Sequence, residues 1–126
     1  VMETGGMKGR RKEMLREELH RILIKRFNLS KIHSEYGMTE LLSQAYSKGG
    51  GIFECPPWMR VSFRDTNDPL SINKNSGGIN IIDLANVYSC SFIASQDLGK
   101  FHHKNTFKVL GRFDSSDVRG CNLMVI

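Results

Sequence analysis

The stretch Ser34-Glu35-Tyr36-Gly37-Met38-Thr39-Glu40 joins a predicted short strand, at about residues 31–35, to a predicted short helix from Thr39 to about Ser47. It places an aromatic ring, a glycine, a hydroxyl and a carboxylate at the end of a strand. This set suits a nucleotide, because a ring can stack on a base and glycine lets the backbone approach phosphate. A hydroxyl can donate to phosphate, and a carboxylate can bind Mg²⁺. Each residue type is common, so the neighbouring segments decide what the stretch means.

Upstream, the pattern predicts a strand, a glycine turn and a long helix. Residues 1–4 have the character of a strand that runs directly into Gly5-Gly6, where small residues let a base or a phosphate touch the backbone. A lone Gly-Gly pair is more often a plain strand-to-helix turn. Residues 10–27 repeat apolar side chains at helical spacing, which predicts an amphipathic helix. A chain that begins inside a strand is expected to be a piece of a longer protein.

Downstream, Gly49-Gly50-Gly51 and Cys55-Pro56-Pro57 interrupt the α/β alternation. Turn-rich pieces then separate five predicted strands, at residues 59–64, 78–84, 89–94, 106–113 and 122–126. We therefore expect an α/β fragment of α+β character, in which residues 1–126 form one domain or part of one. Its strand-helix-strand-helix half at residues 1–48 would bind the nucleotide, and residues 49–126 would form a small antiparallel, β-barrel-like half.

The composition is that of an ordinary soluble globular protein, with 126 residues of which 40% are hydrophobic and 25% charged. No apolar run approaches the roughly 20 residues that cross a bilayer. Three cysteines without CxxC spacing argue against a disulfide scaffold or a zinc site, and indicate a reducing, cytoplasmic location. The net charge of +5 gathers in residues 8–31. Such a cluster is interpreted as the solvated basic face of a helix. The alternative is a non-catalytic module that uses residues 8–31 to bind nucleic acid or anionic lipid.

Two further motifs suit a nucleotide site. Ser95-Gln96-Asp97-Leu98-Gly99 follows an apolar run, and an acidic residue at the end of a strand can accept hydrogen bonds from both ribose hydroxyls. A turn-forming aspartate is the commoner case. Gly111-Arg112-Phe113-Asp114 supplies a guanidinium that can fork onto ribose or phosphate oxygens, or that can simply lie in a surface loop.

The motifs occur in an order that resembles the C-terminal portion of the adenylate-forming superfamily, which contains acyl-CoA synthetases, phenylacetate-CoA ligases and luciferases. The order is Gly5-Gly6, Glu35-Tyr36-Gly37-Met38-Thr39-Glu40, Gln96-Asp97-Leu98-Gly99 and Gly111-Arg112-x-Asp114. Arg119-Gly120-Cys121, close to the end of the chain, makes the likeness strongest to the acyl-protein synthetase branch. That branch is the fatty-acid-activating component of bacterial bioluminescence reductase complexes.

The resemblance implies an adenine site at the start of the chain and in the first motif quoted above. Gly5 and Gly6 would line the adenine face, and Tyr36 would stack on the base. Glu35 would lie beside the edge of the base, and Gly37 would form part of the same cofactor-binding turn.

The same resemblance implies residues for the phosphates, the ribose and a moving lid. Thr39 would contact phosphate, and with Glu40 it would take part in catalysis. Glu40 would also hold Mg²⁺. Asp97 would bind the ribose hydroxyls, and Arg112 would strengthen that binding. Asp114 would be the hinge about which a C-terminal lid turns.

Cys121 is implied to carry the acyl group as a thioester before it is passed on. Arg119 lies two residues away, and a nearby cation favours the reactive thiolate. The alternative is a buried, inert cysteine on the last predicted strand, since free cysteine is among the most buried residue types. Cys55 and Cys90 are interpreted as structural.

The function implied is that of part of an ATP-dependent fatty-acyl-activating enzyme, which forms an acyl-adenylate and transfers the acyl group to a thiol. ATP and Mg²⁺ are the expected cofactors, and a carboxylic acid and an acyl-acceptor or reductase protein are the expected partners, without nucleic acid or a membrane span. Coenzyme A is the alternative acceptor, as in a phenylacetate-CoA ligase-like protein. A homologue that only binds nucleotide is a third possibility. The superfamily's upstream Gly-rich loop and its lid lysine are absent from this chain, so the fragment alone is expected to be inactive.

Overall fold

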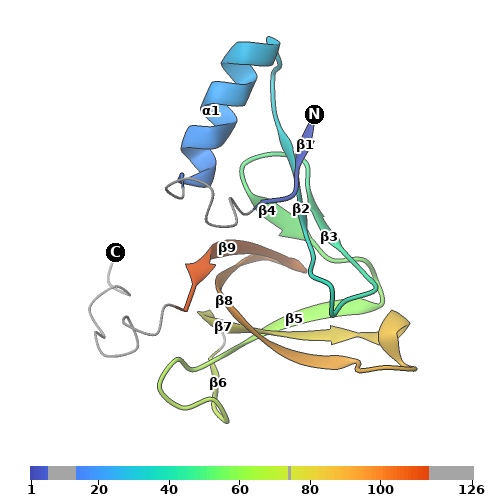
Figure 1. Ribbon diagram of the computed structural model, residues 1–126. Coiled ribbons are helices and arrows are strands. Elements are labelled where there is room, and N and C mark those ends of the chain that lie inside the picture. The colour runs from blue at the N-terminus through green and yellow to red at the C-terminus, as the bar shows by residue number, and fades with distance from the viewer. Residues whose placement is uncertain (6–13, 74, 114–126) are drawn as a thin grey trace.

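The computed structural model describes residues 1–5, 14–73 and 75–113, which form one mixed sheet of nine strands and a single α-helix (Figure 1). The helix α1 spans Arg16–Phe27, and a short 3-10 helix, η1, spans Leu84–Asn86. The strands lie in the order β1-β2-β3-β4-β9-β8-β7-β5-β6 across the sheet. Their bounds are β1 Met2–Glu3, β2 His33–Tyr36, β3 Ala45–Ser47, β4 Ile52–Glu54, β5 Met59–Arg64, β6 Ile72–Asn73, β7 Ser76–Asp83, β8 Phe92–His103 and β9 Thr106–Arg112.

One pair of these strands is parallel. β1 pairs with β2 so that Met2 lies opposite His33, and the other neighbouring strands pair antiparallel. The connection β1-α1-β2 is therefore followed by antiparallel pairing through the rest of the sheet. This confirms the broad α+β class. Among the described residues, α1 is too short and too polar to cross a membrane.

The predicted helix from Thr39 to about Ser47 is wrong. Its first residues form a turn, and its last residues form the strand β3. Long-range hydrogen bonds outweigh local helix propensity here. The backbone N–H groups of Leu42 and Ser43 donate to the carboxylate of Asp83, which lies on a distant strand, rather than to carbonyls of a preceding helical turn.

The expected barrel-like half is also corrected, because the sheet is strongly bent but not closed. Its end strands, β1 and β6, lie at opposite ends of the strand order. Figure 1 shows β8 as one long curved strand, where the sequence predicted a strand at 89–94 followed by a turn. The register shifts between Gly78 and Asn80 in β7 and between Leu98 and Gly99 in β8. Such bulges bend strands locally and increase their twist.

The predictions for the other strands agree more closely with the structure. The strand predicted at residues 59–64 is β5, the one at 106–113 is β9, and the one at 78–84 is β7 within two residues at its start. The strand predicted at residues 122–126 lies outside the described residues. Within the part described, the helix predicted at 10–27 is α1.

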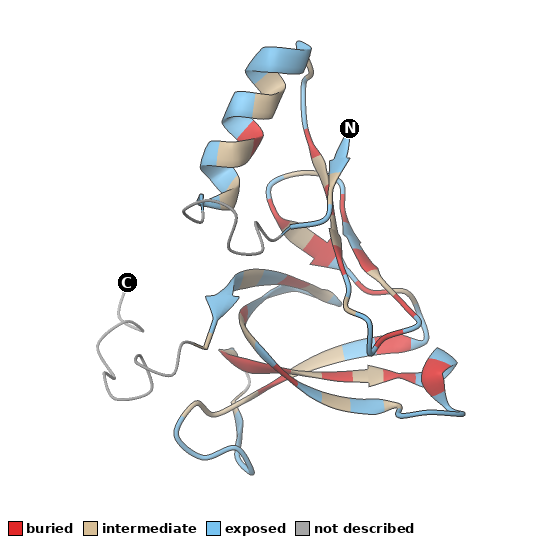
Figure 2. Cartoon of the chain, in the orientation of Figure 1, coloured by how far each residue is buried: buried red, intermediate tan, exposed pale blue. Residues whose placement is uncertain are grey.

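The core is formed by buried residues that recur along the strands of the sheet (Figure 2). Phe53 and Phe107 lie opposite each other on β4 and β9, and both are fully buried. On β7, Ile79 and Ile81 point inward at every second position, as the two-residue period of a strand requires. Burial raises the pKa of the Cys55 thiol to about 11, which fits the structural role expected of this cysteine.

A polar cluster ties α1 to the first two strands. Glu3 accepts a hydrogen bond from Arg16 Nε at 3.0 Å and lies 3.1 Å from His20 Nε2, which in turn lies 3.3 Å from Ser34 Oγ. Burial alone would raise the pKa of Glu3, yet Ser34, His20 and the Arg16 guanidinium hold this pKa below its ordinary value. His20 is the buried residue of α1, while apolar Ile22 remains exposed.

We expect Gly99→Ala to lower the free energy of unfolding by about 1–3 kcal/mol, the usual cost of overpacking a filled core. A Cβ atom at Gly99 would lie 2.8 Å from side-chain carbons of Ile79 and Phe63. Urea unfolding followed by circular dichroism measures the change. Gln96→Ala, on the exposed face of the same strand, is the control and should change stability by less than about 0.5 kcal/mol. Equal stabilities for the two variants would contradict this packing.

Candidate functional site

The parallel pairing of β1 and β2 places two glycines of the predicted nucleotide site at one edge of the sheet. Gly5 follows β1 and Gly37 follows β2, and the carboxyl ends of parallel strands meet at the same edge. Gly5 has φ +74°, a conformation that side-chain-bearing residues rarely adopt. Ligands of α/β folds bind outside the carboxyl ends of such strands. The described part of the predicted adenine site therefore has the topology that such a site needs.

A hydrogen bond brings Asp97, of the motif Gln96-Asp97-Leu98-Gly99, to this edge, although β2 and β8 are not neighbours in the sheet. The Tyr36 hydroxyl, on the last residue of β2, donates to Asp97 Oδ2 at 2.8 Å. Asp97 lies opposite Arg112 across β8 and β9, and Arg112 Nε is 3.5 Å from Asp97 Oδ1. The Arg112 side chain is 70% exposed, so solvent screens this ion pair strongly. Asp97 thus lies in the middle of a strand, not at the strand end that the sequence predicted.

The ring of Tyr36 belongs to the aromatic core. Its centroid lies 5.9 Å from that of Phe53 and 5.4 Å from that of Phe107, edge-on to the latter, and the residue is 7% exposed. Burial raises the pKa of the Tyr36 hydroxyl, and the charge of Asp97 raises it further. The hydroxyl is therefore held as a neutral donor that orients the Asp97 carboxylate. Little of the ring surface is open to a stacking ligand.

The residues predicted for phosphate and Mg²⁺ lie in the turn after β2. Gly37, Thr39 and Glu40 are exposed there, and the N–H of Leu41 donates to the Met38 carbonyl oxygen at 3.0 Å. Glu35 lies one residue before Tyr36 on β2 and therefore on its opposite face, across from Tyr46 of β3. The structure thus separates Glu35 from the Tyr36–Asp97 pair and leaves Thr39 and Glu40 accessible.

This turn is held by two buried side chains that no motif in the sequence indicates. Asp83, at the end of β7, is fully buried, and Asn86 in η1 is 5% exposed. The N–H groups of Leu42 and Ser43 donate to Asp83 Oδ2, and the Asn86 side-chain amide donates to the Glu40 carbonyl oxygen at 2.8 Å. A signal existed in the sequence, because Asp83 continues the inward-facing period of Ile79 and Ile81. A charged residue in phase with a buried apolar face indicates a specific hydrogen-bonding role.

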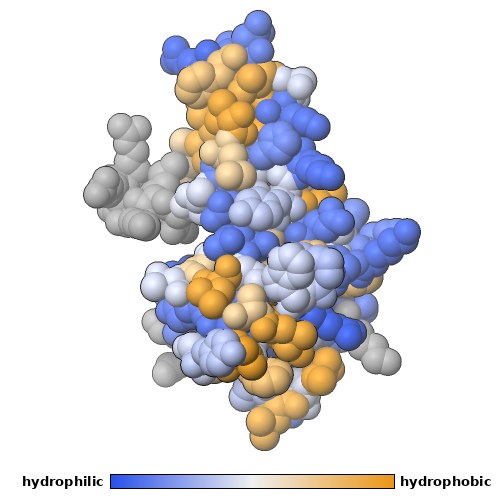
Figure 3. All heavy atoms as spheres, turned by 90° about the vertical axis from the view of Figure 1, so that its right-hand side faces the viewer, coloured by the Kyte–Doolittle hydropathy of each residue, from blue (hydrophilic) through white to orange (hydrophobic). Residues whose placement is uncertain are grey.

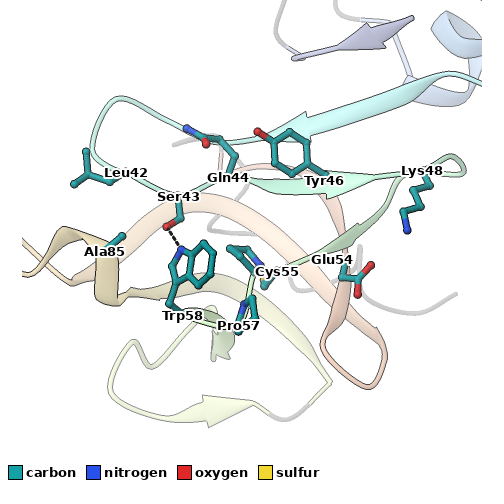
Figure 4. Close-up of a pocket in the computed structure, with 11 residues that line it drawn as sticks. Leu42, Ser43, Gln44, Tyr46, Lys48, Glu54, Cys55, Pro57, Trp58 and Ala85 are labelled. Carbon is teal, nitrogen blue, oxygen red and sulfur yellow. Dashed lines mark hydrogen bonds between the residues drawn. The ribbon is translucent and has the colours of Figure 1, made fainter.

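A groove of about 580 Å³ adjoins the turn on the outer face of the sheet (Figure 4). Trp58, 52% exposed, forms one wall, and its Nε1 donates to Ser43 Oγ at 2.9 Å. The groove is lined by Leu42, Tyr46, Lys48, Glu54, Pro57 and Trp58, among others. Figure 3 shows apolar side chains gathered on the side of the molecule where η1 lies, and Leu84 and Val87 are exposed there.

Gly6, Asp114, Arg119 and Cys121 lie outside the described residues, so their implied roles stay predictions. Among the residues that the structure describes, no three acidic, histidine or cysteine side chains form a group that could enclose a metal ion. Mg²⁺ in nucleotide sites is commonly held by one or two carboxylates together with phosphates and water. The exposed carboxylate of Glu40 fits that kind of binding.

Solved structures with this fold include two ligases. With an acyl-CoA synthetase (AMP-forming)/AMP-acid ligase II-like protein from Dyadobacter fermentans, the TM-score is 0.51 at 19% identity, over 74% of this chain and 25% of that one. With O-succinylbenzoate coenzyme A synthetase from Bacillus subtilis, in complex with AMP, the TM-score is 0.51 at 20% identity, over 75% of this chain and 23% of that one. The chain therefore shares the fold of these proteins and spans about a quarter of their length.

No protein-family model matches the sequence, and no curated protein does. The structural comparison shows a fold shared with these AMP-forming ligases, and membership of the adenylate-forming superfamily stays a prediction. The acyl-protein synthetase branch stays a prediction.

We expect Tyr36→Phe to lower the free energy of unfolding by about 0.5–1.5 kcal/mol, because it removes a hydrogen-bond donor from the largely buried Asp97 carboxylate. Tyr46→Phe is the matched control, since Tyr46 lies on the outer face of the adjacent strand and is 48% exposed. It should change stability by less than about 0.5 kcal/mol. Denaturant unfolding of both variants measures the difference, and a control as destabilised as Tyr36→Phe would contradict this role of the hydroxyl.

Proposed function

We propose that this chain is part of an ATP-dependent adenylate-forming enzyme, which activates a carboxylic acid as an acyl-adenylate and then transfers the acyl group to a thiol. One observation carries the proposal. The ends of β1 and β2, the Tyr36–Asp97 hydrogen bond and Arg112 converge at one edge of a fold shared with AMP-forming ligases. Because the chain spans about a quarter of those structures, the activity belongs to a longer protein.

The geometry of the edge supports the nucleotide-binding roles that we propose. Asp97 would accept hydrogen bonds from the ribose hydroxyls, since the Tyr36 hydroxyl and the Arg112 guanidinium fix the orientation of its carboxylate. Gly5 and Gly37 would allow the base and the phosphates to approach the backbone. With Tyr36 largely enclosed, its contact with the base would involve the small exposed part of the ring.

The chemical step in this proposal needs positioning and neutralisation of charge. The substrate carboxylate attacks the α-phosphorus of ATP, the bond to the bridging oxygen breaks, and pyrophosphate leaves with the electron pair. Thr39 would donate to a phosphate oxygen, and Glu40 would hold Mg²⁺. Bound there, Mg²⁺ would supply neutralisation of the negative charge that develops on the phosphates. The acyl-adenylate is a mixed anhydride that a thiol opens, releasing AMP.

The finer identity that we propose is the acyl-protein synthetase branch, with a fatty acid as substrate and Cys121 as the first thiol to accept the acyl group. The support is the sequence Arg119-Gly120-Cys121, in which a cation close to the cysteine favours the thiolate. Coenzyme A as the acceptor, as in a phenylacetate-CoA ligase-like protein, is the second candidate. The name of the Bacillus subtilis protein, a coenzyme A synthetase, favours this candidate.

Intact-mass measurement on the full-length protein that contains this chain distinguishes the two acceptors. The protein is incubated with ATP, Mg²⁺ and a panel of fatty acids, beside its Cys121→Ser variant. An acyl mass increment on the parent and none on the variant is the expected result. Release of pyrophosphate without an increment would contradict the role of Cys121 and favour coenzyme A. Absence of both signals would contradict the fatty-acid-activating function.

Asp97→Ala tests the nucleotide site, with the rate of pyrophosphate release measured at varied ATP concentration. A hydrogen bond to a charged group contributes about 1.5–3 kcal/mol, so kcat/KM for ATP should fall by roughly ten- to a hundredfold. Asp68→Ala is the control, because within the described part of the chain the Asp68 carboxylate accepts hydrogen bonds from Leu70 and Ser71 of its own exposed turn. Equal kinetics for the parent and Asp97→Ala would remove Asp97 from the site.

A further inference from the structure

We propose that Asp83 is a positioning residue of the active site, whose carboxylate sets the conformation of the turn that presents Thr39 and Glu40. The role given to the turn rests on the proposed function, while the anchoring itself rests on geometry alone. Asp83 touches neither of the two residues it would position. It acts through the backbone immediately after them.

The carboxylate accepts four hydrogen bonds, and three of them come from the segment after Glu40. Oδ2 accepts from the N–H groups of Leu42 at 3.0 Å and Ser43 at 2.9 Å. Oδ1 accepts from the Ser43 hydroxyl at 2.7 Å and from the N–H of Ala85 at 3.1 Å. Two consecutive amides that share one oxygen fix the direction in which the chain leaves the turn. The anchor and the turn are 40 residues apart in sequence.

A second contact fixes the backbone of the turn at Glu40 itself. The Asn86 side-chain amide donates to the Glu40 carbonyl oxygen at 2.8 Å and to the Cys90 carbonyl oxygen at 3.0 Å. Asp83 and Asn86 are separated by only two residues, at the junction of β7 and η1. The backbone of Glu40 is thus held by Asn86, and the backbone two residues later by Asp83. Thr39 and Glu40 lie at the start of this fixed segment, and their side chains are exposed.

The negative charge of Asp83 is essential to this arrangement. No arginine, lysine or histidine of the described residues forms an ion pair with Asp83, so hydrogen bonds alone stabilise the buried anion. An ionised carboxylate only accepts hydrogen bonds, and it therefore matches four donors. Burial alone would raise the pKa of Asp83, yet the bonds from Ser43, Ala85 and Leu42 hold it below its ordinary value. In Asp83→Asn, an NH₂ group would replace one carboxylate oxygen. Its N–H groups would then face two of the four donors, which have no acceptor there.

Trp58 links this anchor to the groove. Its indole N–H donates to the Ser43 hydroxyl, which in turn donates to Asp83 (Figure 4). The indole therefore occupies an acceptor position of the hydroxyl and directs the hydroxyl proton toward the carboxylate. Ser43 offers a milder change than Asp83, because Ser43→Ala removes one donor to the carboxylate and leaves its three backbone bonds, from Leu42, Ser43 and Ala85, in place.

The test uses the full-length protein and its variants Asp83→Asn and Ser43→Ala, with Asp68→Asn as the matched control on an exposed turn. Hydrogen exchange followed by mass spectrometry reports on the amides of Leu42 and Ser43 without requiring activity. In Asp83→Asn these amides should exchange at least about tenfold faster, and in Ser43→Ala by a smaller factor. The control should leave their exchange unchanged.

The functional measurement is the rate of pyrophosphate release that depends on the carboxylic acid substrate. For Asp83→Asn, kcat should fall about ten- to a hundredfold while KM for ATP changes less than about threefold, because the turn would act on the phosphates mainly in the transition state. In Ser43→Ala, kcat should also fall, by a smaller factor, while KM for ATP again changes little. A purely structural role predicts a lower melting temperature with kcat unchanged per folded molecule.

The outcomes separate this proposal from the function on which it rests. Unchanged exchange in both variants, or faster exchange with kcat within twofold of the parent, would overturn the positioning role. If Asp83→Asn does not fold, Ser43→Ala decides by the same criteria. A parent without activity would remove the proposed function and with it the catalytic role of the turn. The exchange data would then still decide whether Asp83 anchors the segment.

Discussion

The hydrogen bond between Tyr36 and Asp97 depends on the curvature of the whole sheet. β2 and β8 are separated by three strands in the sheet order, yet the phenol oxygen and the carboxylate lie 2.8 Å apart. Bulges in β7 and β8 bend the sheet, and the aromatic cluster of Tyr36, Phe53 and Phe107 fills the space enclosed by the bend. The same core that stabilises the fold therefore brings an acidic side chain to the carboxyl ends of β1 and β2.

The site is assembled from two regions that are held differently. The Tyr36–Asp97–Arg112 group is fixed by side chains on regular strands, whereas Thr39 and Glu40 lie in a turn without secondary structure of its own. Such a turn needs acceptors for its backbone donors, because unpaired buried N–H groups are costly. Asp83 supplies them from the adjacent end of β7. The groove beside Trp58 is lined by Leu42 and Ser43, which directly follow this turn.

Local patterns in the sequence predicted α1, β2, β5, β7 and β9, since apolar spacing and turn residues determine those elements largely on their own. The helix predicted after Thr39 failed because the hydrogen-bond partner of that segment lies on β7, far along the chain. The strand end predicted at Asp97, in the motif Ser95–Gly99, was wrong for a similar reason. Pairing with β7 and β9 keeps these residues within β8, and Gly99 is required there by the close side chains of Phe63 and Ile79.

The candidate site was predictable in its residue types but not in its geometry. The motifs identified Tyr36, Asp97 and Arg112 as one group, and the structure places them together. It also encloses the Tyr36 ring and places Glu35 on the other face of β2, which depends on strand register and core packing. Asp83 carried no motif at all. Its only sequence signal was a charge in phase with the buried residues of β7.

The central claim is that a nucleotide binds where the ends of β1 and β2 meet Asp97. Photolabelling of the full-length protein with an azidoadenine analogue of ATP, followed by peptide mapping, tests it most directly. The account predicts modification of peptides that contain residues 1–5 or 35–40, with protection by unmodified ATP. Labelling that ATP prevents but that maps elsewhere in the protein, or no labelling that ATP prevents, would contradict it.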